Sequence, residues 1–289
     1  MKTLLLDVGG TFIKCSDGRE IPIRSDGSRE EISSSFAEAV GAFCNKDSCV
    51  NDAETASGNR QRDCEIAVAI PGPFDYERGI FLMKHKFFAV YGMSFREVAG
   101  VPSCVRLLFT HDVNVMLAGE MFYGNGRGYS RVALVALGTG LGFAMSIDGR
   151  ILKKATGSPL ISIFGLPYRD GILEDYASKR GFLGTFKALG GQGAATVKDI
   201  AEFAGGGDKV ALETFRTIGS TIARTISPIL KEYGIECLLF GGQISRSFRF
   251  LEPALREGLS GVESLVDISQ VSNFDNATFN GLRALLRQE

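Results

Sequence analysis

The sequence predicts an α/β fold built from two similar halves that face each other. Two segments of the 289-residue chain share one pattern, in which an apolar strand runs into a turn rich in glycine and threonine and a second strand returns from it. The first segment spans residues 3–15 and the second spans residues 132–147. Glycine-rich turns between apolar runs are typical of β-hairpins. The two segments lie roughly one domain length apart, which indicates a duplicated unit.

The first half begins with two apolar strands, Thr3–Asp7 and Phe12–Cys15, and Glu20–Ile23 can add a third. Residues Arg29–Phe43 carry apolar side chains at helical spacing, which predicts an amphipathic helix. The segment Asn45–Asp63 is polar in composition and predicts a solvated loop or an insertion. The sequence therefore predicts a small sheet with a helix, followed by an interruption.

Strands and helices continue to alternate along the rest of the chain. Glu65–Ile70 and Val105–Phe109 are predicted strands, and Asn114–Met121 is a predicted helix. In the second half we expect strands at Val132–Leu137, Gly142–Ile147 and Glu236–Phe240, a long helix over Val210–Tyr233 interrupted near Pro228, and a final helix at Ala277–Arg287.

The composition is that of an ordinary globular protein, with 45% hydrophobic and 22% charged residues. The formal net charge of −1 gives no indication of a nucleic-acid or anionic-membrane partner. The apolar stretch before Asp7 is too short for a signal sequence or a membrane span. Six scattered cysteines without a CxxC pair indicate reduced thiols. We therefore expect a cytoplasmic protein.

The first chemical motif is the turn at the start of the chain. Without β-carbons, Gly9 and Gly10 let backbone N–H groups approach phosphate oxygens. Thr11 adds a hydroxyl, and Lys14 adds a positive charge near the transferred group. Asp7, at the end of the strand, can hold Mg²⁺ through water, since Mg²⁺ prefers oxygen ligands and keeps several waters. The alternative is an ordinary glycine-rich hairpin with an aspartate at its mouth.

The second motif is the turn Gly138-Thr139-Gly140, followed by Gly142. Alone, this string also fits a plain tight turn. Paired with the first turn in the same local context, it predicts a second phosphate loop that holds the distal phosphates from the opposite side.

The third motif places His111 and Asp112 after a predicted strand and before a predicted helix. A carboxylate there can accept the proton of an attacking hydroxyl. The alternative is that Asp112 caps the helix. The position of the string between the two glycine turns favours catalysis.

Two further strings are less specific. The predicted strand that ends at Gly241 and Gly242 leaves bare backbone against which adenine and ribose can lie, although a generic strand-to-helix turn has the same pattern. Glu174 can orient substrate hydroxyls. From the local sequence alone, a solvent-facing helix acid is the preferred explanation of Glu174.

Together these strings resemble the ROK family of repressors and kinases, within the actin-like sugar-kinase superfamily, over nearly the whole chain. The resemblance implies a two-domain actin-like, ribonuclease H-like α/β fold with duplicated mixed sheets and a nucleotide cleft between them. It implies a smaller N-terminal domain of residues 1–111 plus 275–289 and a larger C-terminal domain of residues 112–274. It also implies ATP and Mg²⁺ as cofactors and a possible homodimer.

The resemblance assigns roles to individual residues. Asp112 matches the family's catalytic base, and His111 stands where the family has asparagine. Pro71 and Gly72 match a loop near the sugar, and Glu174 matches a sugar-binding glutamate. The turns at Gly9–Thr11 and Gly138–Gly142 match the phosphate motifs, and Gly241-Gly242 matches the adenosine-side turn.

The chain also departs from the family pattern. At the three cysteine positions of the family's zinc string it has Gly165, Pro167 and Ile172, so we expect no zinc. The family's Glu-x-Gly-His string is missing, and the only histidines are His85 and His111. A basic loop at residues 84–88 replaces a sugar-contacting asparagine loop. That loop can suit an anionic sugar, or it can be a solvated loop.

The sequence therefore predicts a cytoplasmic transferase of carbohydrate metabolism, an ATP-dependent sugar kinase that phosphorylates a hydroxyl of a hexose or hexose derivative. The expected partners are a small-molecule sugar and ATP, without nucleic acid or membrane. One alternative is a catalytically silent sugar-binding sensor of the same fold. A transcriptional regulator needs a helix-turn-helix ahead of the kinase-like fold, and Asp7 leaves no room for one. An ATP-driven actin-like or chaperone module is the third alternative.

Overall fold

The computed structural model describes residues 2–41, 43–44 and 64–287 of the chain. The predicted polar loop at 45–63 lies outside the described residues. Within those residues, no helix has the length and apolar character needed to cross a membrane. The chain forms two compact units, the first made of Met1–Val115, Lys153–Ser158 and Thr278–Glu289, and the second made of Met116–Leu152 and Pro159–Ala277. The predicted domain division remains a prediction.

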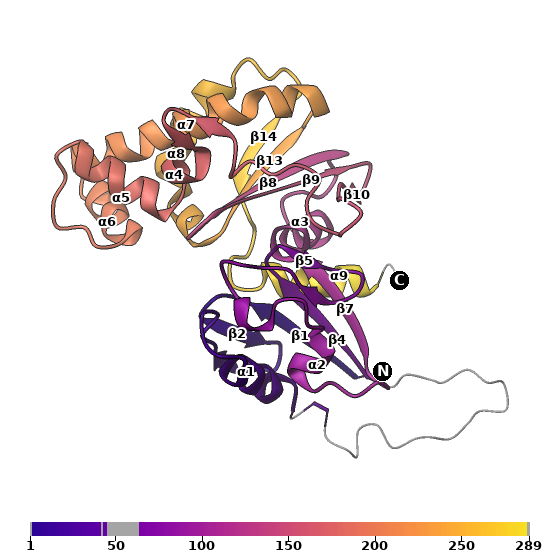
Figure 1. The fold of residues 1–289 in the computed structure, drawn as a ribbon. Coiled ribbons are helices and arrows are strands. Elements are labelled where there is room, and N and C mark those ends of the chain that lie inside the picture. The colour runs from indigo at the N-terminus through magenta and orange to yellow at the C-terminus, as the bar shows by residue number, and fades with distance from the viewer. Residues whose placement is uncertain (1, 42, 45–63, 288–289) are drawn as a thin grey trace. The chain divides into compact units, whose positions relative to one another are not determined.

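The first unit contains a five-stranded mixed sheet in the order β3-β2-β1-β4-β7 (Figure 1). The pairs β3–β2 and β2–β1 are antiparallel, and the pairs β1–β4 and β4–β7 are parallel. The strands are β1 (Lys2–Val8), β2 (Phe12–Cys15), β3 (Glu20–Pro22), β4 (Cys64–Ile70) and β7 (Arg106–His111). The predicted opening hairpin is confirmed.

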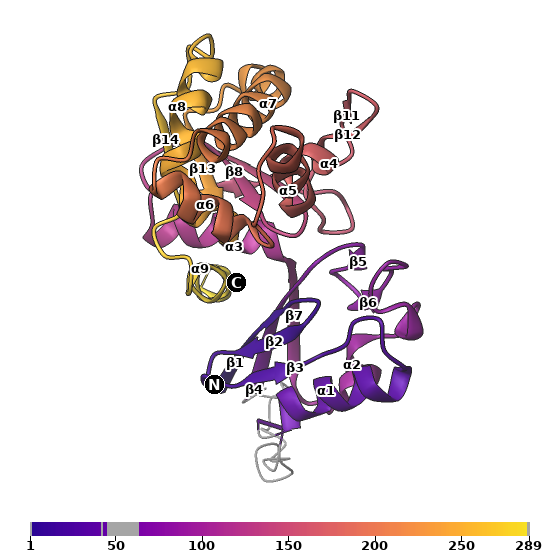
Figure 2. The same ribbon diagram turned by 90° about the vertical axis from the view of Figure 1, so that its left-hand side faces the viewer.

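Helices cover both faces of this sheet, which explains why every residue of β4 is buried. Alternate side chains of β4 face opposite ways. Ile66 and Val68 pack in the cluster that contains Phe36 of α1 (Arg29–Gly41). Ala67 packs on the other side with Leu282 of α9 (Ala277–Leu286). Figure 2 shows α9 on the side of this sheet opposite to α1. Smaller elements of this unit are β5 (Phe74–Asp75), β6 (Ile80–Phe81), η2 (Phe88–Val90) and α2 (Phe95–Ala99).

The second unit repeats the sheet of the first. Its strand order is β10-β9-β8-β13-β14, and the sequence of antiparallel and parallel pairs is the same. The prediction of duplicated mixed sheets is therefore confirmed. The strands are β8 (Arg131–Leu137), β9 (Leu141–Ile147), β10 (Arg150–Ile151), β13 (Cys237–Gly241) and β14 (Asp267–Gln270).

The long helix α7 (Lys209–Tyr233) runs without interruption, so the predicted break near Pro228 is wrong. A proline inside a helix removes a hydrogen bond and clashes with the preceding turn. Here Ile226 and Leu230 are fully buried on either side of Pro228, and α7 packs along α8 (Phe248–Leu259). This packing holds the helix together across the proline.

The remaining elements complete the two units. The helix α3 (Asp112–Tyr123) starts in the first unit and continues into the second. The others are the β11 (Pro167–Tyr168) and β12 (Gly171–Ile172) hairpin, α4 (Leu173–Ala177), α5 (Lys179–Ala188), α6 (Val197–Gly205) and η3 (Gln243–Ser247).

Candidate active site

The turn between β1 and β2 is tight and closed by its own backbone. Gly9 N–H donates to the Phe12 carbonyl oxygen at 2.9 Å. Across the hairpin, Asp7 and Lys14 are directly paired residues. Lys14 Nζ lies 3.7 Å from Glu20 Oε1, and the Lys14 side chain is 48% exposed. The hairpin therefore places a carboxylate and an ammonium group at the base of the glycine turn.

Burial raises the pKa of Asp7 to about 6, and the negative charge of Asp112 adds to the increase. The charge of Lys14 and a hydrogen bond from Thr278 lower it in part. Two neighbouring carboxylates that oppose each other's ionisation suit a cation. Because carboxylates bind a metal through oxygen atoms, this pair suits Mg²⁺.

A cation bound at Asp7 would need ligands besides the side chains of the described residues. Among the described residues, no group of three or more His, Cys, Asp and Glu side chains is arranged to hold a metal. Mg²⁺ commonly binds through one or two carboxylates together with water and substrate phosphates. Asp7 fits that pattern, and the predicted absence of zinc stays a prediction.

Asp112 lies where β7 ends and α3 begins. Its Oδ1 accepts the Val113 N–H at 2.7 Å and lies 2.8 Å from His111 Nδ1. The Val113 N–H also lies 3.3 Å from His111 Nδ1. When Nδ1 is protonated, it donates to the Asp112 carboxylate, because an ionised carboxylate can only accept. Among the described residues, Oδ2 has no hydrogen-bond partner, and the side chain is 44% exposed. One oxygen is therefore fixed by the protein and the other remains available.

Opposing effects set the pKa of the Asp112 carboxyl. Burial raises the pKa, but the His111 charge and hydrogen bond and the Val113 N–H outweigh it, with a smaller contribution from Lys86. The pKa is lowered overall, so the carboxylate is ionised and able to accept a proton near neutral pH.

The predicted substrate residues Gly72 and His111 lie together. A methyl group on Gly72 would lie 3.4 Å from His111 Nε2 and also 3.4 Å from Tyr76 Oη. Tyr76 O–H donates to the Ile70 carbonyl oxygen at 3.0 Å, and burial raises its pKa, so the hydroxyl stays protonated. Pro71 lies in the same turn. The sequence gives no sign of Tyr76 as a site residue, because nothing in the local string distinguishes it from a core residue.

The second glycine turn is held by Glu174. Leu141 N–H donates to Glu174 Oε2 at 3.0 Å, and Arg180 Nη2 donates to Glu174 Oε1 at 3.1 Å. A methyl group on Gly140 would lie only 2.9 Å from Glu174 Oε2. A methyl group on Gly138 would meet nothing within 4 Å, so close packing does not require glycine at this position. The sequence indicated no link between Glu174 and this turn.

The other two predicted residues of this turn region are Gly142, which belongs to a strand, and Thr139, which is exposed. Gly142 pairs with Ala136 in the β8–β9 ladder, and Thr139 lies between the two turn glycines. Both Glu174 oxygens already have protein partners. The predicted contact of Glu174 with sugar hydroxyls remains a prediction.

The turn after β13 needs glycine for packing reasons that the structure makes explicit. A methyl group on Gly241 would lie 2.4 Å from Met116 Sδ, and one on Gly242 would lie 2.3 Å from the Leu137 carbonyl oxygen. Gly242 also has φ = 80°, which side chains rarely adopt. Leu137 directly precedes Gly138, so this turn and the second glycine turn are neighbours within the second unit.

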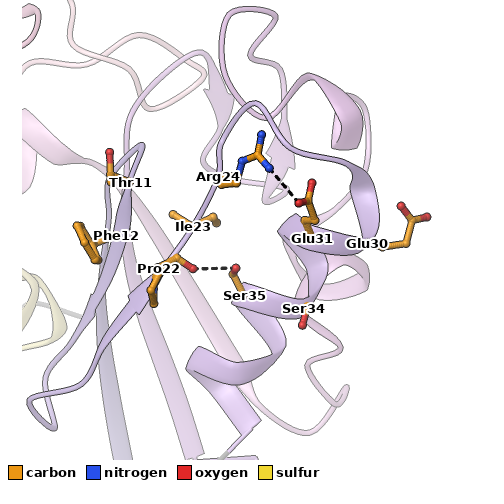
Figure 3. A pocket seen from close by; sticks show the side chains of 9 residues that line it. All are labelled: Thr11, Phe12, Pro22, Ile23, Arg24, Glu30, Glu31, Ser34 and Ser35. Atoms are coloured by element: carbon orange, nitrogen blue, oxygen red, sulfur yellow. Dashed lines mark hydrogen bonds and ion pairs between the residues drawn. The ribbon is translucent and has the colours of Figure 1, made fainter.

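A surface groove of about 700 Å³ lies beside Thr11, lined by β2, β3 and α1 (Figure 3). Two pairs of the residues that line it are hydrogen-bonded to each other. Arg24 Nη1 donates to Glu31 Oε1 at 3.3 Å, and Ser35 Oγ donates to the Pro22 carbonyl oxygen at 2.9 Å. Thr11 is the only predicted site residue among those that line it. The groove therefore adjoins the first turn, and neither Asp7 nor Asp112 lines it.

Comparison with known proteins identifies the family. The ROK family model matches residues 6–159 and 167–288. The chain belongs to the ROK family. It is 25% identical over 214 residues to a glucokinase of Thermotoga maritima, a match that covers 66% of this chain and 68% of that protein.

Two other ROK proteins show the range of the family. The DNA-binding transcriptional repressor Mlc of Escherichia coli is 24% identical over 218 residues, which cover 69% of this chain and 53% of the repressor. The crystal structure of a ROK glucokinase from Streptomyces griseus in complex with glucose and AMPPNP matches with a TM-score of 0.74 at 20% identity, over 99% of both chains. The chain therefore has the actin-like two-domain α/β fold of ROK sugar kinases.

Proposed function

We propose that this ROK protein is a cytoplasmic ATP-dependent kinase that phosphorylates a hydroxyl of a hexose or hexose derivative. The observation that carries the proposal is the Asp112 carboxylate, ionised, fixed through Oδ1 and available through Oδ2. Membership of a family that includes the Thermotoga maritima glucokinase supports it. The Streptomyces griseus relative, solved with glucose and AMPPNP, supports the same donor and acceptor.

In the proposed mechanism, Asp112 Oδ2 accepts the proton of the sugar hydroxyl as that hydroxyl attacks the transferred phosphoryl group. His111 and the Val113 N–H hold the carboxylate in position. Bound ATP-Mg supplies the phosphoryl group and part of the charge stabilisation. Because phosphoryl transfer needs little covalent chemistry from the protein, most of the acceleration comes from positioning and electrostatics.

Binding of the two substrates is divided among the other predicted residues. Gly9 to Thr11 in the first unit, and Gly138, Thr139 and Gly140 in the second, would bind phosphate oxygens through their backbone N–H groups, with Gly142 ordering the second turn. Lys14 would add positive charge, and Asp7 would hold Mg²⁺ through water. Gly241 and Gly242 would hold adenosine, and the residues that would bind the sugar are Pro71, Gly72, His111 and Glu174.

The test is ADP release by the purified full-length protein with ATP-Mg across hexoses, N-acyl hexosamines and sugar acids. We expect one sugar to stimulate turnover. Asp112→Asn should then lower kcat at least about 100-fold, because an amide keeps the shape of the side chain but cannot accept the proton. Asp148→Asn is the matched control, since Asp148 is an exposed turn residue with positive φ that asparagine also adopts. If Asp112→Asn retains most of the turnover, Asp112 is not the base.

A catalytically silent sugar sensor is the second candidate, favoured by the missing Glu-x-Gly-His string. Membership of the family that includes the Mlc repressor is compatible with it. Calorimetric sugar binding without any sugar-dependent ADP release would support the sensor and overturn the kinase.

A further inference from the structure

The ammonium group of Lys86 lies against the first glycine turn. A methyl group on Gly10 would be 3.6 Å from both Cε and Nζ of Lys86, and 3.5 Å from Ser25 Oγ. The Ser25 N–H donates to the Gly10 carbonyl oxygen at 3.4 Å. Gly10, Ser25 and Lys86 therefore form one side of the turn, although they are far apart in the sequence.

The backbone that carries Lys86 is fixed by its neighbour. Phe87 is fully buried, and its ring centroid lies 5.9 Å from that of Phe36 and 5.7 Å from that of Phe81. The Phe87 N–H donates to the Ser25 carbonyl oxygen at 2.5 Å. Phe87 has φ = 54° and ψ = 27°, a left-handed conformation that is an outlier for a bulky residue and persists only where its surroundings impose it. Lys86 is thus placed by a packed anchor and is not part of a freely solvated loop.

The positive charge of Lys86 is not used by an acidic partner. Among the residues that the structure describes, no carboxylate forms an ion pair with Lys86, whereas Lys14 pairs with Glu20. The positive charge of Lys86 also helps to lower the pKa of the Asp112 carboxyl, after the larger lowering effects of His111 and the Val113 N–H. The ammonium therefore contacts the glycine turn and acts electrostatically on the candidate base.

We propose that Lys86 binds a nonbridging oxygen of the γ-phosphoryl group that is transferred. The inference rests on the proposed kinase function. An in-line reaction places the transferred group next to the base and next to the phosphate turn, and Lys86 is a cation that contacts the turn and acts on the charge of the base. The ammonium acts as a compact point charge with three donors.

The transfer balances without any proton from Lys86. The bond between the acceptor oxygen and the γ-phosphorus forms while the bond from that phosphorus to the β,γ-bridging oxygen breaks. The bridging oxygen leaves with the electron pair as part of ADP. The acceptor proton moves to Asp112, and Lys86 stays protonated throughout, offsetting negative charge on the phosphoryl oxygens.

The experiment compares the binding of AMPPNP-Mg and ADP-Mg by calorimetry, so that it needs no identified sugar. Lys86→Met removes the charge and keeps most of the length of the side chain, which becomes one atom shorter. We expect AMPPNP-Mg to bind at least about 10-fold more weakly, as for the loss of a hydrogen bond to a charged group, while ADP-Mg changes less than about twofold. Lys84→Met is the matched control, because Lys84 is exposed and lies over the Tyr91 ring. We expect it to change neither affinity.

Each other outcome overturns a defined part of the reasoning. If the parent protein binds AMPPNP-Mg but Lys86→Met loses no discrimination against ADP-Mg, the Lys86 inference fails and the kinase proposal stands. If the parent binds neither nucleotide, the kinase proposal fails with it. If Lys86→Met keeps the discrimination and loses only turnover of acidic sugars, the anion belongs to the acceptor and the inference is wrong. Lys86→Gln repeats the comparison should Lys86→Met not fold, as judged by its urea unfolding midpoint.

Discussion

Glu174 has two possible roles that one substitution separates. In the structure its carboxylate fixes the second glycine turn through the Leu141 N–H and is itself bonded by Arg180. Glu174→Ala removes a hydrogen bond to a charged acceptor, worth about 1.5–3 kcal/mol. The Arg180 side chain is 57% exposed, so its ion pair adds at most about 1 kcal/mol. We therefore expect a loss of about 2 kcal/mol in the free energy of unfolding.

Urea denaturation of the full chain measures this loss. With an m-value of about 3 kcal/mol per molar urea, the midpoint of the second unit should fall by about 0.7 M. The apparent KM for ATP should rise because the turn is no longer held, while the KM for the sugar changes little. Glu202→Ala is the control, since Glu202 pairs with Lys198 on an exposed helix surface and its loss costs at most about 0.5 kcal/mol. An unchanged midpoint together with a higher sugar KM alone would show that Glu174 is a sugar ligand and not a brace.

Three further predictions concern packing, thiol reactivity and pH. Gly281→Ala should destabilise the protein by about 3 kcal/mol or more, because the new methyl would lie 1.7 Å from the Val115 carbonyl oxygen; a parent-like urea midpoint would contradict this packing. At pH 8, a thiol reagent should label exposed Cys104 and spare Cys237, whose pKa burial raises to about 12, and equal labelling by mass spectrometry would refute the burial. Between about pH 4 and 6, Asp7 is protonated in the folded protein and ionised in the unfolded chain. The folded state therefore gains stability from binding this proton at about pH 4 and loses that gain as the pH rises through about 6. Without Mg²⁺, the stability of Asp7→Asn relative to the parent should therefore rise over that range by up to about 3 kcal/mol, and a difference that does not vary with pH would argue against the raised pKa.

The local sequence was sufficient for the strands that carry the glycine turns. The pattern of apolar run, glycine turn and returning strand predicted the β1–β2 and β8–β9 hairpins, because hydrophobic periodicity and turn chemistry act over a few residues. The break near Pro228 was wrong because packing on both sides of the proline outweighs its local cost. The repeated pattern indicated two similar halves, but only the strand pairing in the structure established that the two sheets have the same strand order.

The candidate site divides in the same way. The sequence alone indicated the candidate site residues in each turn and at the start of α3, because motif residues can be recognised from residue type and spacing. Only the tertiary structure brought Lys86 to Gly10, linked Glu174 to the second turn, and placed Tyr76 beside Gly72 and His111. These contacts join residues far apart in the chain. They depend on the packing of anchors such as Phe87, and no local pattern encodes which distant group a buried anchor will place beside a turn.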